Sequence, residues 1–243
     1  YYIHDQGDVW SPGWAPAKAE LSNYECRHGM GYTKIKGERG GIESEVTFFV
    51  PIDSNAEVHK FTLTNKSSNK KDIKLFSYVE WCLWDAQDDS TNYQRNLNTG
   101  EVEVKDSVIY HKTEYKERRN HFAFFSVNTP ISGFDSDRES FLGTYNGYEN
   151  PQAVMDGKST NSVADGWSPV ASHSIDVSLE PGEEKTYIFV LGYIENDVDD
   201  KWESKNVINK TKSDAMIEKF ATVEAVDQAL LELANYWDAL LSK

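Results

Sequence analysis

Apolar and polar residues alternate along most of the first 190 or so positions of the chain. Short runs rich in β-branched and aromatic residues recur there, separated by glycine, proline and asparagine. This pattern predicts many strands joined by hairpins without intervening helices, which is typical of an antiparallel β-sandwich. The strands expected on this basis include residues 43–50, 57–64, 107–111 and 185–191.

Two segments depart from the simple alternation. Residues 75–83 carry bulky side chains at both odd and even positions, which predicts one strand buried on both faces. Residues 129–174 are rich in glycine, serine, asparagine and aspartate and look like one long connection. A connection of that length in a compact domain normally implies a function or a packed interface.

The hydrophobic period changes after Asn196 from two to between three and four. The spacing predicts a first helical stretch over 198–220 and a second over 226–241, with Thr222 as the N-cap of the second. We therefore divide the chain into a sandwich domain, residues 1–195, and a helical linker, residues 196–243. The apolar stripe of the second helix needs a partner, which is either the sandwich or a domain outside this chain.

Composition excludes some classes of partner. Lysine and arginine number 25 and aspartate and glutamate 40, so the net charge is −15, which disfavours nucleic acids and anionic membranes. No apolar run approaches membrane-spanning length. Cys26 and Cys82 lack the spacing of a metal site or a disulfide framework, so we expect no bound metal and a reduced, cytoplasmic protein.

A polar segment follows directly on residues 75–83 and holds the candidate chemistry. Asp85, Asn92, Tyr93 and Arg95 lie in it among further amides and carboxylates. A rigid strand that leads into such a loop is suited to binding a polyhydroxylated ligand. Two roles stay open for Arg95 at this point: its fork of donors can bind sugar hydroxyls, or it can form a structural ion pair with a neighbouring aspartate.

Other clusters are weaker candidates. Asp88 and Asp89 could be the acids of a glycosidase, but adjacent residues of an extended loop point in different directions, so ligand contact or hydrogen bonding within the loop is the better interpretation. The basic segment 111–121 could attract phosphate, although its glutamates favour a solvated, salt-bridged edge. Residues 135–146 lack the glycine and glutamate of a calcium loop. Residues 26–28 are expected to be part of a packed strand rather than a thiol site.

Several blocks together resemble the cellobiose phosphorylases, a family of inverting glycoside phosphorylases, over essentially the whole chain. The blocks are residues 24–32, 85–96, 110–115, 117–121, 133–141 and 166–169. The resemblance implies conversion of cellobiose and phosphate to α-glucose 1-phosphate and glucose. It also implies that this chain is the N-terminal sandwich and linker of a longer protein, and that the family's α/α helical barrel, which carries the general acid, is not in it.

The resemblance also implies roles for particular residues. Arg95, in the motif of residues 93–96, is expected in the acceptor glucose subsite, with Asn92, Tyr93 and Asp85 near it. No catalytic residue is expected in this chain, and no cofactor, since inorganic phosphate is a co-substrate. The expected partners are cellobiose or glucose, the barrel and a second subunit in a homodimer. The alternatives are a non-catalytic carbohydrate-binding β-sandwich and a self-contained glycosidase that uses Asp88.

Overall fold

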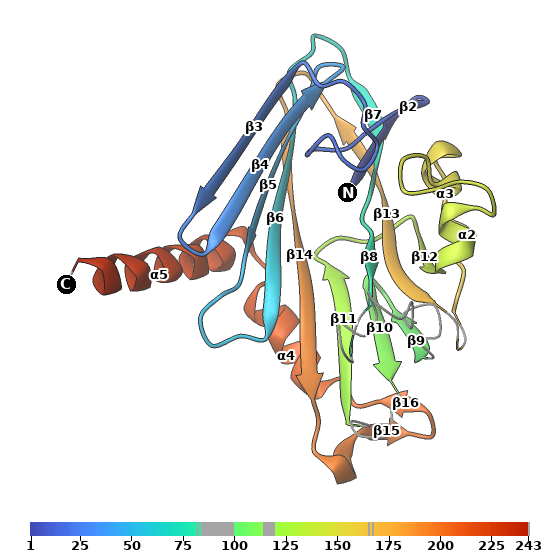
Figure 1. Ribbon diagram of the computed structural model, residues 1–243, viewed down its shortest axis with the longest axis vertical. Coiled ribbons are helices and arrows are strands. Elements are labelled where there is room, and N and C mark those ends of the chain that lie inside the picture. The colour runs from blue at the N-terminus through green and yellow to red at the C-terminus, as the bar shows by residue number, and fades with distance from the viewer. Residues whose placement is uncertain (82, 84–99, 114–119, 165, 167, 243) are drawn as a thin grey trace.

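Two antiparallel β-sheets packed face to face form the body of the structure, a computed structural model that describes residues 1–81, 83, 100–113, 120–164, 166 and 168–242 (Figure 1). The larger sheet has the strand order β3-β4-β5-β6-β14-β11-β10-β9. Its strands are β3 (Asn23–Gly29), β4 (Tyr32–Arg39), β5 (Ile42–Phe49), β6 (Ala56–Asn65), β9 (Gly100–Lys105), β10 (Val108–Thr113), β11 (His121–Val127) and β14 (Glu184–Glu195). The four strands predicted from the alternation correspond to β5, β6, β10 and β14.

The smaller sheet has the order β12-β13-β7-β1-β2, with β8 also paired to β13. Its strands are β1 (Tyr2–Asp5), β2 (Asp8–Trp10), β7 (Lys71–Phe76), β8 (Val79–Glu80), β12 (Gly133–Asp137) and β13 (Pro169–Leu179). Every strand pair in both sheets is antiparallel. The predicted mainly β, antiparallel sandwich is therefore confirmed.

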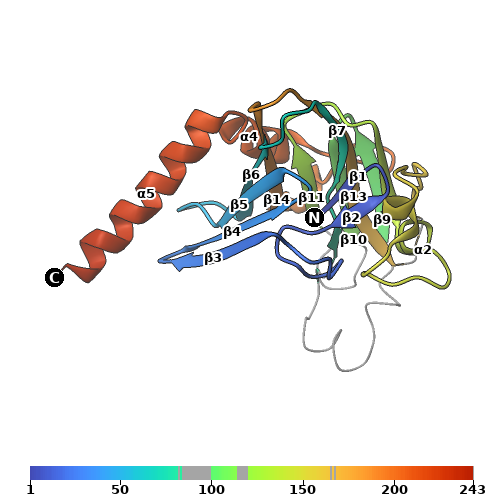
Figure 2. The same ribbon diagram turned by 90° about the horizontal axis from the view of Figure 1, so that it is seen from above.

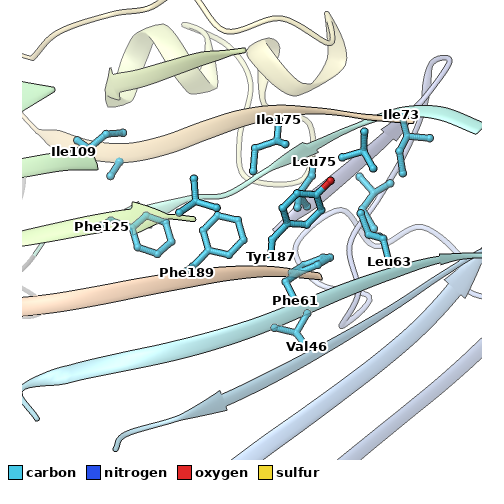
Figure 3. Packing of buried hydrophobic residues seen from close by; sticks show 14 of the residues in the cluster. Val46, Phe61, Leu63, Ile73, Leu75, Ile109, Phe125, Ile175, Tyr187 and Phe189 are labelled. Carbon is cyan, nitrogen blue, oxygen red and sulfur yellow. The ribbon is translucent and has the colours of Figure 1, made fainter. Parts of the chain in front are cut away.

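The main core lies between the two sheets (Figure 3). Phe61, Phe125 and Phe189 from the larger sheet face Leu75 and Ile175 from the smaller one, and all five are at most 2% exposed. These residues alternate in sequence with side chains on the opposite face of their strands, as a period of two requires. Burial of so many large side chains from both sheets is the main source of stability of the sandwich.

Helices cover the outer face of the larger sheet. They are α4 (Thr211–Lys219) and α5 (Val223–Leu241), and a second apolar cluster joins them to the sheet. Phe122, Phe124 and Val190 of the sheet belong to this cluster together with Phe220 and Val226 of the helical part. Central strands of this sheet are therefore buried on both faces, and all seven residues of β11 are buried.

The C-terminal part is helical as predicted, but the first helical stretch is shorter than its spacing indicated. Residues 198–210 form a 3-10 turn, η2 (Val198–Asp200), and a small hairpin of β15 (Trp202–Ser204) and β16 (Val207–Ile208) before α4 begins. The side chains of Val198 and Trp202 are exposed. Only Ile208 among the apolar residues of this part is buried, so their spacing imitates a helical period without a shared buried face.

The second helix begins where the sequence placed it. Thr222 is the N-cap of α5, and its hydroxyl accepts a hydrogen bond from the backbone N–H of Ala225 at 3.2 Å. Val226 and Leu233 are buried, whereas Leu231, Tyr236 and Leu240 are exposed near the end that projects away from the sheets (Figure 2). Within the described residues, none of the helices combines the length and the apolar character needed to cross a membrane.

Residues 75–83 do not form one strand. β7 ends at Phe76 and β8 covers only Val79 and Glu80, because both pair with β13 at separate places along it. The prediction of burial on both faces holds for Leu75 and Phe76, which are both fully buried. The chain bends between the two strands at Ser77, whose hydroxyl accepts from the backbone N–H of His173 and bonds its imidazole, both at 2.9 Å.

The segment predicted as one long connection, 129–174, contains regular structure. β12, α2 (Arg138–Leu142) and α3 (Gln152–Met155) lie in it, and β13 begins at Pro169. Phe141 and Val154 pack with Tyr2 and Phe76 in a third apolar cluster on the outer face of the smaller sheet. Asp135, considered above as a calcium ligand, is buried and accepts hydrogen bonds from Thr160 and Ser162. The segment is a packed layer of the fold.

Candidate functional site

The four residues that the sequence singled out, Asp85, Asn92, Tyr93 and Arg95, lie outside the described residues, as do Asp88 and Asp89. Their arrangement therefore stays a prediction. The structure does describe both flanks of the segment that holds them. β8 ends at Glu80 before the segment, and β9 begins at Gly100 after it.

One buried histidine contacts both flanks. The indole of Trp81 stacks on the imidazole of His111, with ring centroids 5.6 Å apart and an angle of 13° between the planes. Gly100 lies so close to the same ring that a Cβ there would be 2.1 Å from Cε1 of His111. A side chain at position 100 would collide with the imidazole, so glycine is required for this packing. His111 thus holds together the two ends of segment 82–99.

His111 is neutral at physiological pH. It is fully buried, and burial lowers its pKa to about 3, with a smaller contribution from nearby His121. Among the described residues neither ring nitrogen of His111 has a hydrogen-bond partner. Its contribution is therefore through its shape and its stacking, and protonation would place an uncompensated charge in the core.

The described part of the basic segment, residues 111–113, 120 and 121, is not the solvated edge that its composition favoured. His111, Lys112 and His121 are each at most 3% exposed. The segment's own glutamates lie outside the described residues, so their salt bridges stay a prediction; Lys112 Nζ lies 2.9 Å from both Glu101 and Glu103 of β9. The strand pairing of β10 with β9 and β11 forces these residues into the sheet, so Lys112 is charged but paired beneath the surface.

Glu103 ties the linker to the sandwich on this outer face of the sheet. It accepts hydrogen bonds from Lys210 Nζ at 2.5 Å and from the backbone N–H of Ile208 at 2.9 Å. Burial raises the pKa of Glu103, but these bonds and that of Lys112 outweigh it, so the pKa lies below its usual value. The carboxylate is ionised and serves as a structural anchor.

Glu80, the last residue of β8, is held by three donors. Its Oε1 accepts from Tyr78 OH at 2.7 Å, from Tyr148 OH at 2.5 Å and from Arg138 Nε at 2.9 Å. Burial raises the pKa of Glu80, yet the three hydrogen bonds lower it by more. An ionised carboxylate with these donors positions β8 against α2 and is unsuited to the role of general acid.

A hollow of about 470 Å³ opens beside these flanks. Glu57, Glu80, Trp81, Leu83 and Tyr193 are among the residues that line it. On its edge, His59 Nε2 bonds Glu57 Oε1 at 2.6 Å, and this hydrogen bond keeps the pKa of Glu57 below its usual value. Of the described residues that line the hollow, the two carboxylates, Glu57 and Glu80, are therefore ionised, which fits sugar binding better than proton donation.

Metal chemistry finds no support in the described part of the chain, where no cluster of three or more histidine, cysteine or acidic side chains could hold an ion. Cys26 lies in the exposed strand β3, near His28, with Sγ and Nε2 3.4 Å apart. The strand at 26–28 was predicted correctly, but its packing was not, because β3 is an edge strand.

Sequence reasoning missed the anchoring residues Trp81, His111, Arg138 and Tyr148. Trp81 lies near the end of residues 75–83, shortly before the polar segment, and a bulky aromatic residue at the end of a predicted strand is a signal for an anchor. Nothing local marks the other three. His111 meets Gly100 only through strand pairing, and Arg138 meets Glu80 across 58 residues of chain.

Comparison with known proteins supplies the family. The model of the glycosyl hydrolase 94 supersandwich domain matches residues 1–223. The solabiose phosphorylase of Paenibacillus borealis is 31% identical over 195 residues, which are 79% of this chain and 25% of that protein. The N,N'-diacetylchitobiose phosphorylase of Vibrio proteolyticus is 28% identical over 98% of this chain and 28% of its own length.

Solved structures agree on the fold. A bacterial glucoamylase complexed with acarbose has a TM-score of 0.55 and 12% identity, over 97% of this chain and 31% of that one. At this identity the likeness concerns the fold alone. The chain spans less than a third of the curated relatives it matches. It belongs to the glycosyl hydrolase 94 family, of which it contains the supersandwich domain.

Proposed function

We propose that this chain is the N-terminal part of an inverting disaccharide phosphorylase, and that the disaccharide is cellobiose. The whole enzyme would transfer the non-reducing glucosyl unit to inorganic phosphate, releasing α-glucose 1-phosphate and glucose. Phosphate is then a co-substrate, and no cofactor is needed. The observation that carries the proposal is the match of the supersandwich domain over residues 1–223, together with relatives that are named as disaccharide phosphorylases.

In this proposal the segment between Trp81 and Gly100 forms one wall of the acceptor glucose subsite. Arg95 binds the acceptor hydroxyls through its guanidinium, and Asn92, Tyr93 and Asp85 lie beside it. The packing of both flanks on His111 supports this role, because a sugar-binding segment must be anchored at a rigid end of the scaffold.

The general acid and the phosphate site belong to the remainder of the enzyme, which we propose to be an α/α helical barrel. The exposed side chains Leu231, Tyr236, Leu240 and Leu241 on α5 offer it an apolar contact. We further propose a homodimer that works in the cytoplasm. A non-catalytic carbohydrate-binding sandwich is the less favoured alternative, because the curated relatives cited are enzymes.

Replacement of Arg95 by alanine in the full-length enzyme tests the acceptor role. Loss of a charge-assisted hydrogen bond costs about 1.5 to 3 kcal/mol, so kcat/KM for glucose in the synthetic direction should fall roughly tenfold to a hundredfold. Arg27→Ala is the matched control, since Arg27 is exposed on β3 and pairs with Glu25. An unchanged kcat/KM for glucose in the Arg95 variant contradicts the proposed role.

A substrate panel tests the choice of disaccharide. Phosphorolysis of cellobiose, solabiose and N,N'-diacetylchitobiose is measured with the same enzyme preparation by release of the sugar 1-phosphate. The proposal expects the highest kcat/KM with cellobiose. A preference for one of the other two keeps the phosphorylase function and replaces the substrate, whereas turnover of none of them removes support for both.

A further inference from the structure

A second hollow is lined by α2 and the loop that leads from it to α3. Figure 1 shows both helices beside β12 and β13 of the smaller sheet. Its volume is about 380 Å³, which is at the small end of the range of roughly 300 to 1,000 Å³ for ligand pockets. Polar and apolar surfaces contribute equally to its lining, which consists of Arg138, Glu139, Leu142, Gly143, Thr144, Asn146, Gly147, Tyr148 and Ser168. All but the last come from one short stretch of the segment 129–174.

One of the polar groups that line the hollow is a guanidinium in a fixed position. Arg138 donates from Nε to Glu80 and from Nη2 to the hydroxyl of Tyr148, both at 2.9 Å. Its Cζ also lies over the ring of Tyr148, 5.4 Å from the centroid. About a third of the side chain remains exposed, and Nη1 has no hydrogen-bond partner among the described residues. The group is thus oriented before any ligand binds and keeps donors to offer.

The rim of the hollow is likewise held in place by hydrogen bonds of its own. Asn146 Nδ2 donates to Gln152 Oε1 at 2.9 Å, and the backbone N–H of Gly147 donates to Asn150 Oδ1 at 3.2 Å. Gly143 has φ of +85°, which lets the chain turn sharply after α2. A hydroxyl, an amide and the backbone of two glycines therefore line the same hollow as the guanidinium.

Charge indicates the class of ligand. The positive charge of Arg138 is neutralised by Glu80, whose pKa is kept low by the same contact, and Glu139 adds a negative charge to the rim. A free anion is therefore disfavoured. The donors and acceptors instead match a neutral molecule with several hydroxyl groups, which can bond a guanidinium and an amide at once.

We propose that this hollow binds one hexose unit of a neutral saccharide, with Arg138 and Asn146 as the principal contacts and Thr144 at the rim. The choice of saccharide rests on the proposed function. The network from Arg138 through Glu80 links the hollow to the last residue of β8, immediately before Trp81. The segment 129–174 thereby gains a binding function in addition to packing.

The test is calorimetric titration of the full-length enzyme with cellobiose in the absence of phosphate. The wild type should show two sugar-binding events per chain. Asn146→Ala and Thr144→Val, both at the surface of the hollow, should each weaken one event about three- to tenfold, as expected for loss of one hydrogen bond. Gln228→Ala is the control: this exposed amide bonds Glu232 on α5 and is remote in sequence from the hollow, and it should change neither event.

The variants Arg95→Ala and Asn146→Ala separate the two hypotheses. Asn146→Ala should weaken one binding event and Arg95→Ala the other. In the double variant both events should be weakened, each by the same factor as in the single variant. Loss caused only by Arg95→Ala overturns the inference and leaves the proposed function in place. If only Asn146→Ala weakens binding, the acceptor role of Arg95 is overturned and the inference about this hollow stands. A third outcome is that the enzyme binds inorganic phosphate without sugar and that Asn146→Ala removes this binding. That result would also overturn the proposal of a neutral saccharide ligand.

Discussion

β11 and β3 are strands of the same sheet and have seven residues each, yet they lie in opposite environments. All seven residues of β11 are buried, whereas five of the seven in β3 are exposed. The difference comes from what covers the sheet. β11 lies between the smaller sheet and the layer of α4 and α5, while β3 forms the edge and pairs only with β4 (Figure 2). Burial in this sheet follows position in the layers, and strand formation alone does not decide it.

The largest expected effect comes from truncation of matched aromatic residues in the two strands. Phe124→Ala in β11 removes a fully buried ring and should lower the free energy of unfolding by about 3 to 5 kcal/mol, since it leaves a cavity. Tyr24→Ala in β3, where the side chain is 51% exposed, should change it by less than about 1 kcal/mol. Urea unfolding followed by circular dichroism measures both. A similar decrease in the free energy of unfolding for both variants would contradict the difference in burial between β11 and β3.

Two glycines sharpen the comparison, because at each of them an added Cβ would collide with an aromatic ring, but only one of the two rings is fully buried. A Cβ at Gly192 of β14 would lie 2.3 Å from Phe124, and one at Gly29 of β3 would lie 2.0 Å from Tyr32. Phe124 is fully buried and cannot move aside, so Gly192→Ala should cost about 1 to 3 kcal/mol. Tyr32 is only half-buried and can swing into solvent, so Gly29→Ala should cost clearly less. The same unfolding experiment ranks them; a higher cost at Gly29 contradicts the argument.

The pH dependence of stability is a third way to sharpen the comparison. The pKa of His111 is lowered to about 3 in the folded protein and is near 6.5 in the unfolded chain, so between these values only the unfolded chain binds the proton. Stability from this residue is therefore complete above pH 6.5 and declines as the pH falls toward 3. His111→Phe keeps an aromatic ring against Trp81 and should flatten this decline. His28→Phe, at an exposed position of β3, should leave it unchanged.

His173 contributes to the same decline, because burial also lowers its pKa to about 3. The variant at His111 should therefore remove part of the pH dependence and not all of it. The measurement is the free energy of unfolding at several pH values between 4 and 7 for wild type and both variants. An identical slope for wild type and the His111 variant would show that the buried imidazole does not stay neutral.

The local sequence pattern correctly predicted features that depend only on a few neighbouring residues, such as strands and a helix cap. The four strands with clear alternation are present in the structure. Thr222 was correctly predicted as an N-cap, because a hydroxyl directly before an apolar helical run can accept a hydrogen bond from the first turn of the helix. The same reasoning failed for residues 198–210, where apolar residues that are mostly exposed happen to have a helical spacing. It failed for Lys112 as well, whose burial depends on Glu103 and on the hairpin that covers it.

The candidate site also has a part that could be predicted from the local sequence and a part that could not. The polar segment that contains Arg95 was visible from the sequence, because its composition alone sets it apart. The residues that anchor its flanks were not, since Trp81, Gly100 and His111 come together only when β9 pairs with β10 and the two sheets close. The hollow beside Arg138 depends in the same way on a carboxylate that is distant in the chain.

By itself, the sequence determined the strand-rich architecture, the helical C-terminal part, the acidic surface and the segment most suited to a sugar. Each of these follows from short-range periodicity or from composition. The tertiary structure alone decided which strands lie in the centre, which charged groups are buried and paired, and which side chains anchor the candidate site. Those properties depend on contacts between residues far apart in the chain, and such contacts have no local signature.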